Sequence, residues 1–241
     1  MFFEFIENIV KLSIIIACLY FSIIIYVRNK HPTWSGPLEK RRFTILLVLI
    51  LAVVAIKISE DVLYAESGAF DKAVLLYIHN HLPASLNRFF EIITVSGSLK
   101  LLLPLTLILT LSLFYAKRRF EALLLASSVV SAAMIVYLVK TLVGRDRPLL
   151  WQTAWYWGSS FPSGHTLVVS AFATAAALCV GSIWPTKQRL ALSVAMLWLG
   201  SVAFSRLVLG VHWPTDVLAA VCIGIFIPLM MNMLIRLRNT E

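Results

Sequence analysis

The sequence predicts an all-α integral membrane protein, and three observations support this fold class. Of the 241 residues, 60% are hydrophobic and 14% are charged, and the mean hydropathy is +0.87. Seven apolar runs are long enough to cross a bilayer, which takes about 20 residues of helix. The charged residues lie in short clusters between these runs. The runs must be helical, because the bilayer core offers the backbone no other hydrogen-bond partners.

Charged residues and turn formers separate the predicted spans. In chain order, the seven spans are residues 5–27, 43–64, 98–116, 120–143, 163–183, 190–209 and 213–235. The first span begins among Glu4, Glu7 and Lys11, and its start lacks the basic residues of a signal peptide. We therefore expect the first span to remain in the mature protein. The fifth span follows Pro162 and begins at Ser163, a residue type that caps helices.

A short helix on the outer surface is predicted between the second and third spans. Apolar residues recur there at helical spacing: Phe70, Val74, Tyr77, Ile78 and Leu82. His79 and His81 lie on the same segment and could bind a metal, but no carboxylate or cysteine stands beside them. We interpret both as solvated surface residues. The sequence has no fixed-period repeat and no low-complexity linker, so it predicts one domain.

The basic clusters predict how the chain crosses the membrane. They alternate along the connections: residues 28–42, 117–119, 187–189 and 236–238 are rich in Lys and Arg. Cytoplasmic loops carry such an excess, so the C-terminus is expected in the cytoplasm and, with seven spans, the N-terminus outside. The formal net charge of +9 is explained by these clusters. It therefore does not indicate a nucleic-acid partner.

The stretch 205–216 holds the first candidate for chemistry. His212 and Asp216 are four residues apart, so they share one face of a helix and the carboxylate can reach the imidazole. Such a carboxylate fixes the histidine tautomer and leaves the other ring nitrogen available as a nucleophile or base. Arg206 supplies a cation suited to a phosphate. Taken alone, the stretch is equally well explained as a polar loop that happens to hold a histidine.

Two further polar groups stand out in the apolar background. Lys140 lies inside the fourth span, where a lysine is costly without a partner or a task. Ser163 and Gly164 open the fifth span with the free amides of a helix start, which favour an anion, and His165 follows them. In the predicted topology these groups, together with Arg147 and the 205–216 stretch, all reach the outer face. Several cations, helix-start amides and two histidines at one locus predict a phosphoryl-transfer site.

These residues resemble the type-2 phosphatidic acid phosphatase superfamily. Its three signature motifs are present in order: Lys140 with Arg147-Pro148, then Pro162-Ser163-Gly164-His165, then Ser205-Arg206 with His212 and Asp216. The resemblance covers residues 140–216. It implies a six-helix membrane phosphatase core, here residues 43–241. The departure from the family pattern is an extra N-terminal transmembrane helix, which forms with its basic cytoplasmic loop a separate segment, residues 1–42.

The resemblance also implies a role for each motif residue. His212 would attack phosphorus and form a phosphohistidine, Asp216 would orient His212, and His165 would protonate the leaving oxygen and then activate water. The phosphate would be held by the remaining motif residues, Lys140, Arg147, Ser163, Gly164 and Arg206. No metal and no cofactor is expected, because fixed cations can neutralise the phosphoryl charge.

The expected function is hydrolysis of a membrane lipid phosphate or diphosphate, such as undecaprenyl diphosphate, phosphatidylglycerophosphate or phosphatidic acid. The enzyme would lie in the cytoplasmic or inner membrane, with its site facing the outside or the periplasm. A lipid phosphotransferase using the same phosphohistidine is an alternative that the motifs do not separate. An anion transporter is disfavoured, since the polar groups gather at one face. An inactive scaffold is disfavoured because every motif residue is intact.

Three smaller interpretations concern residues outside the motifs. Arg145 and Asp146 are interpreted as a local ion pair that shapes their loop. Lys57 and Asp61, four residues apart in the second span, are interpreted as a structural pair. The aromatic residues Trp151, Trp155, Tyr156 and Trp157 are typical of an interfacial belt. A lip that grips a lipid substrate is compatible with the same cluster.

Overall fold

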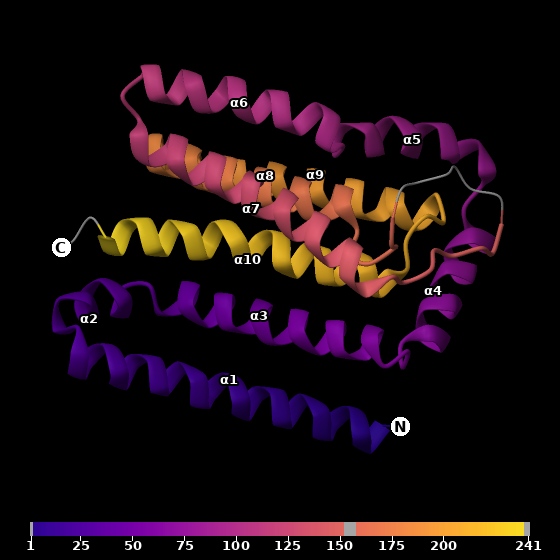
Figure 1. Cartoon of the computed structure of the whole chain (residues 1–241), viewed down its shortest axis with the longest axis horizontal. Coiled ribbons are helices and arrows are strands. Elements are labelled where there is room, and N and C mark those ends of the chain that lie inside the picture. The colour runs from indigo at the N-terminus through magenta and orange to yellow at the C-terminus, as the bar shows by residue number, and fades with distance from the viewer. Residues whose placement is uncertain (1, 152–157, 239–241) are drawn as a thin grey trace.

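The computed structural model describes residues 2–151 and 158–238, and all regular structure within them is helical (Figure 1). The elements are α1 (Phe2–Lys30), α2 (Pro32–Glu39), α3 (Arg42–Leu63), α4 (Gly68–His81), η1 (Ala84–Leu86), α5 (Asn87–Ser96), α6 (Leu99–Tyr115), α7 (Arg119–Val143), α8 (Gly164–Ile183), η2 (Pro185–Lys187), α9 (Gln188–Val208) and α10 (Pro214–Arg238). Seven helical segments are long and apolar enough to cross a membrane. The predicted all-α membrane fold is confirmed.

Each predicted span falls on a helix, and the differences lie in the connections. The third apolar segment is longer than predicted, because α5 precedes α6 with only Gly97 and Ser98 between them. Helix α2 was not predicted, since its proline, glycine and polar residues read as a loop. The predicted surface helix is present as α4, but it is not wholly exposed: Asp71 and Leu75 are both fully buried.

Helix α8 forms the centre of the bundle and packs against α7, α9 and α10. Its buried residues include four alanines, two threonines and one serine, and such small residues let transmembrane helices approach closely. At Gly224 of α10, an added Cβ would lie 2.5 Å from Ser170 Cβ and 2.6 Å from the carbonyl oxygen of Leu167. Glycine is therefore required where α10 crosses α8.

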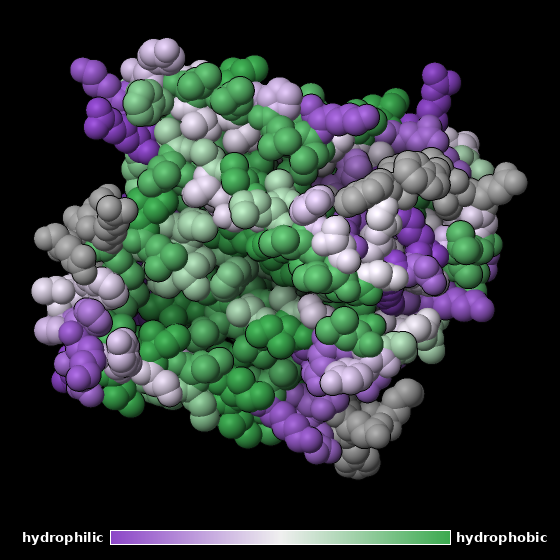
Figure 2. Space-filling view, in the orientation of Figure 1, coloured by the Kyte–Doolittle hydropathy of each residue, from purple (hydrophilic) through white to green (hydrophobic). Residues whose placement is uncertain are grey.

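Different helices lie at the two ends of the bundle. The start of α10 lies beside α4, and its last turns lie near α2 (Figure 1). We call these the α4 end and the α2 end. In the face shown in Figure 2, hydrophobic residues fill the middle and hydrophilic ones gather toward the two ends, as expected of a multi-pass membrane protein. Helix α1 lies at the edge of the bundle, and its main contacts are with α2 and α3.

Candidate active site

The predicted site residues converge at the α4 end of the bundle. Lys140 comes from the last turn of α7, Ser163 from the start of α8 and Arg206 from the last turns of α9. His212 lies in the short turn before α10, and Asp216 in the first turn of that helix. All five are at most 8% exposed, although all of them are polar or charged. Burying so many polar groups in one place is costly unless they pair with each other or with a ligand.

His212 is the best-defined group of the site. Its Nδ1 lies 3.6 Å from Asp216 Oδ2, and its Nε2 lies 3.4 Å from Arg147 Nη1. Because the guanidinium can only donate, Nε2 must be the acceptor and the ring proton is assigned to Nδ1, on the Asp216 side. The lone pair of Nε2 therefore points toward a cation. A phosphate oxygen bound by Arg147 would therefore lie next to this lone pair.

The charge state of His212 follows from its surroundings. Burial lowers its pKa well below 6.5, and the cations of Arg206, Arg147 and Lys140 lower the pKa further. The imidazole is therefore neutral at neutral pH, so its Nε2 lone pair is available for attack.

The three predicted phosphate-binding cations are fixed by backbone and side-chain acceptors. Lys140 Nζ donates to the carbonyl oxygen of Ser159, and Arg147 Nη2 approaches the same oxygen at 3.5 Å. Arg147 Nη1 also donates to the carbonyl of Val211 at 2.8 Å. Arg206, fully buried, donates from Nη1 to Thr94 Oγ1 of α5 at 2.6 Å. The cations are thus held in place before any ligand arrives, which lowers the reorganisation needed to bind an anion.

The start of α8 lies against these cations. An added Cβ on Gly164 would lie 3.2 Å from Val136 Cγ1 and 3.8 Å from Lys140 Cε, so the glycine lets α8 approach α7 beside the lysine. His165 is close enough to Arg206, His212, Lys140 and Arg147 to interact electrostatically with all four. Ser163 also has partners within the protein: its amide donates to the carbonyl of Asp216 at 3.2 Å, and its hydroxyl pairs with Thr166.

The partners of Arg145 were not predicted from the sequence. Its guanidinium donates from Nη1 to Asp216 Oδ1 at 2.5 Å and from Nη2 to Asp71 Oδ2 at 2.6 Å. Thr215 completes this network, since its amide donates to Asp71 Oδ1 at 2.9 Å and its hydroxyl to Asp71 Oδ2 at 2.7 Å. The predicted pair of Arg145 with Asp146 is therefore wrong. Arg145 instead ties α4 to the start of α10 and holds the carboxylate beside His212.

Two further interpretations are confirmed. His79 and His81 are exposed, and the ring of His79 also stacks on Trp151 with centroids 4.1 Å apart. The structural pair of Lys57 and Asp61 is confirmed at 2.9 Å. The remaining residues of the aromatic cluster, Trp155, Tyr156 and Trp157, lie outside the described residues. Within residues 2–151 and 158–238, no group of three His, Cys, Asp or Glu side chains is placed to hold a metal ion.

Comparison with known proteins gives consistent matches. Phosphatidylglycerophosphatase B of Escherichia coli is 40% identical over 67 residues, which is 28% of this chain but only 25% of that protein. An undecaprenyl-diphosphatase of Sulfolobus acidocaldarius is 26% identical over 189 residues, covering 76% of this chain and 85% of that protein. The crystal structure of a PAP2-type phosphatidylglycerolphosphate phosphatase from Bacillus subtilis superposes with a TM-score of 0.69. That match covers 80% of this chain and 96% of the other at 22% identity, and so shows a shared fold.

The sequence model of the PAP2 superfamily matches residues 121–239. That range contains all the motif residues from Lys140 to Asp216. Through this region, the chain belongs to the PAP2 superfamily.

Proposed function

We propose that the chain is an integral membrane phosphatase that hydrolyses a lipid phosphate or diphosphate through a phosphohistidine. The observation that carries this proposal is the position of neutral His212, whose Nε2 lone pair points at Arg147 inside a cluster of three fixed cations. The names of the relatives support it, since they are phosphatases of membrane lipids.

In the proposed reaction, the phosphoryl oxygens lie among Lys140, Arg147 and Arg206. Nε2 of His212 forms a bond to phosphorus while the bond from phosphorus to the lipid oxygen breaks. His165 gives its proton to that oxygen as it leaves. Asp216 balances the positive charge that develops on the ring of His212. Water then attacks phosphorus and passes a proton to His165. The N–P bond breaks, and neutral His212 and inorganic phosphate are released.

The lipid character of the substrate is supported by an apolar cavity of about 760 Å³. It lies between α3, α7 and α10, and its lining includes Ile56, Leu63, Ile135 and Phe226. Leu63 ends α3 next to α4, so the cavity reaches the same end of the bundle as the site. We propose that an acyl or prenyl tail uses this cavity while the headgroup phosphate reaches His212. Among lipid phosphates, we favour undecaprenyl diphosphate.

Phosphate release from the purified chain tests this function. We expect hydrolysis of undecaprenyl diphosphate, phosphatidylglycerophosphate or phosphatidic acid at a much higher kcat/KM than that of glucose 6-phosphate. Activity should survive EDTA, because the fixed cations already surround the phosphate, and vanadate should inhibit as a mimic of five-coordinate phosphorus. Complete loss of activity in EDTA with recovery in Mg²⁺ would overturn the metal-independent mechanism. Equal rates on the sugar phosphate would argue against a lipid substrate.

The pH dependence of kcat/KM should reflect the lowered pKa of His212. A lowered pKa means that the ring stays neutral until the pH falls through that value, so the acid-side loss of rate should lie below pH 6.5. In the pH dependence of kcat, the alkaline limb should follow deprotonation of His165 in the substrate complex, where the negative charge of the phosphate favours the protonated ring. The profile should therefore be bell-shaped, and His165→Ala should remove one limb or most of the rate. A rate independent of pH across the range of histidine titration would contradict both roles.

We further propose that the site faces the outside or periplasm. The site residues lie at the α4 end, whereas the basic clusters at residues 28–42, 117–119 and 236–238 lie at the α2 end. In a variant with Cys18, Cys179 and Cys222 replaced by alanine, Lys72→Cys on exposed α4 should react with a membrane-impermeant thiol reagent in intact cells. Lys187→Cys at the opposite end is the matched control and should react only after lysis. The reverse labelling pattern would invert the topology.

A further inference from the structure

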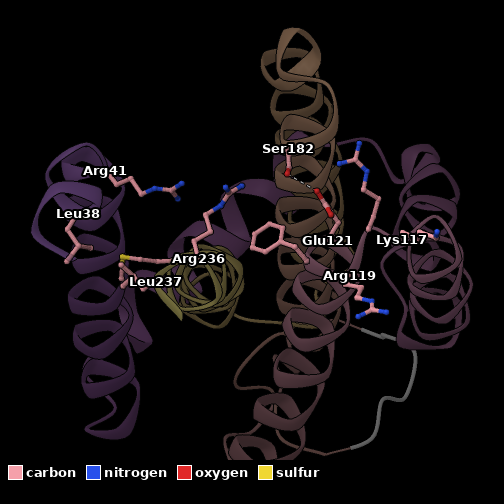
Figure 3. Close-up of a pocket in the computed structure, with 11 residues that line it drawn as sticks. Leu38, Arg41, Lys117, Arg119, Glu121, Ser182, Arg236 and Leu237 are labelled. Carbon is pink, nitrogen blue, oxygen red and sulfur yellow. Dashed lines mark hydrogen bonds between the residues drawn. The ribbon is translucent and has the colours of Figure 1, made fainter. Parts of the chain in front are cut away.

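A second cationic cavity lies at the α2 end, far from His212. It has a volume of about 570 Å³ and lies between the start of α3, the α6–α7 connection and the last turns of α10 (Figure 3). Its lining includes five basic residues from these three segments: Arg41, Lys117, Arg118, Arg119 and Arg236. An adjacent cavity of about 760 Å³ shares Arg41 and Arg236 and adds Lys40. Arg41 and Arg236 therefore line both hollows.

The positive charge of this cavity is not balanced by the protein. The single carboxylate in its lining, Glu121, is 5% exposed and accepts a hydrogen bond from Ser182 Oγ at 2.8 Å. Within the described part of the chain, no carboxylate lies within 4.0 Å of the charged nitrogens of the five basic residues. Arg41 and Arg236 extend toward the hollow, whereas Lys117 and Arg119 point away from it and lie at its rim (Figure 3).

Arg236 is held in place, and Arg41 faces it. Arg236 Nε donates to Asn232 Oδ1 at 2.9 Å, and its guanidinium lies 4.6 Å above the ring of Phe120. Burial lowers the pKa of Arg41, and the nearby charge of Arg236 lowers the pKa further. Two like charges that line the same hollow repel each other, and an anion between them would relieve the repulsion.

We propose that this cavity binds the phosphate group of an anionic phospholipid from the cytoplasmic leaflet. The bias of basic residues toward the cytoplasm explains why the loops are basic. It does not require them to surround a hollow or to place Arg41 against Arg236. Leu38, Met233 and Leu237 add apolar surface to the lining, which suits the glycerol and upper acyl carbons better than a free phosphate ion. Basic pockets between transmembrane helices on this side bind anionic headgroups in this way.

Thermal unfolding of the delipidated full chain in neutral detergent tests the proposal. Titration with phosphatidylglycerol should raise the unfolding temperature, whereas phosphatidylcholine and soluble glycerol phosphate should not at the same concentrations. Arg41→Gln and Arg236→Gln should each raise the half-saturating concentration of phosphatidylglycerol roughly fivefold. The double variant should raise it roughly twentyfold or more. The variants Arg41→Lys and Arg236→Lys should keep most of the rise in unfolding temperature that phosphatidylglycerol causes. Arg189→Gln, an exposed change outside both cavities, is the matched control and should leave it unchanged.

Several outcomes would overturn the proposal. Equal stabilisation by phosphatidylcholine would remove the preference for an anion, and a full response to glycerol phosphate would identify a soluble phosphate ester instead of a lipid. An effect of Arg41→Gln no larger than that of Arg189→Gln would show that only general surface charge is involved. If the arginine variants do not fold, Lys117→Gln with Arg118→Gln changes two exposed residues at the rim. Retention of full lipid affinity by that variant would likewise reject the site.

Discussion

Replacing His212 with alanine is expected to reduce phosphate release by at least about a thousandfold, because the change removes the proposed nucleophile. The protein should still fold, since Arg147 keeps its bond to the carbonyl of Val211 and Asp216 keeps its bond from Arg145 when the imidazole is removed. His81→Ala is the matched control: this histidine is exposed at the same end and bonds only locally, to the carbonyl of Tyr77. Its phosphate release should match that of the unmodified chain.

The proposed covalent intermediate gives a second readout for the same prediction. Rapid quenching with a ³²P-labelled lipid phosphate should leave acid-labile label on the protein, and the label should be absent from His212→Ala. Asp216→Asn should fold and retain the site but turn over far more slowly, because the amide cannot balance the charge on the imidazole. Substantial turnover by His212→Ala, or label mapped to another residue, would reject the phosphohistidine mechanism.

Replacing Arg145 with methionine is expected to cost about 3–5 kcal/mol of stability, the largest structural effect that we predict. Asp71 and Asp216 are both fully buried, and the substitution would leave two carboxylates without their shared cation. Turnover should fall as well, since Asp216 loses one of the contacts that fix it beside His212. Thermal unfolding in detergent and phosphate release measure the two effects.

Matched variants separate this network from general loss of charge. Arg88→Met removes an exposed arginine of α5 and should change stability by no more than about 0.5 kcal/mol. Arg145→Lys should be intermediate, because one ammonium cannot bridge two carboxylates as a guanidinium does. Asp71→Asn combined with Arg145→Met should cost less than the sum of the single changes, since the pair is coupled. An Arg145→Met protein as stable as the unmodified chain would show that the bridge does not contribute.

The sequence alone determined the seven membrane-spanning helices and gathered the motif residues at one end. Hydropathy is sufficient for this, because a bilayer permits an apolar run of about 20 residues only as a helix. Alternating spans then bring Lys140, the start of α8 and the stretch before α10 to the same side. The order of the spans therefore predicted the cluster of Lys140, His165 and His212 before any distance was known.

Only the tertiary structure decided which side chains pair. Arg145 is adjacent to Asp146 in sequence, yet its partners are Asp71 and Asp216, because the packing of α4 against the start of α10 brings two buried carboxylates to its guanidinium. Arg206 likewise bonds to Thr94 of α5, more than a hundred residues earlier in the chain. The cavity at Arg41 and Arg236 also depends on packing, since the same basic loops would satisfy the charge bias without it. Hydropathy acts locally along the chain, whereas these contacts depend on how helices distant in sequence meet.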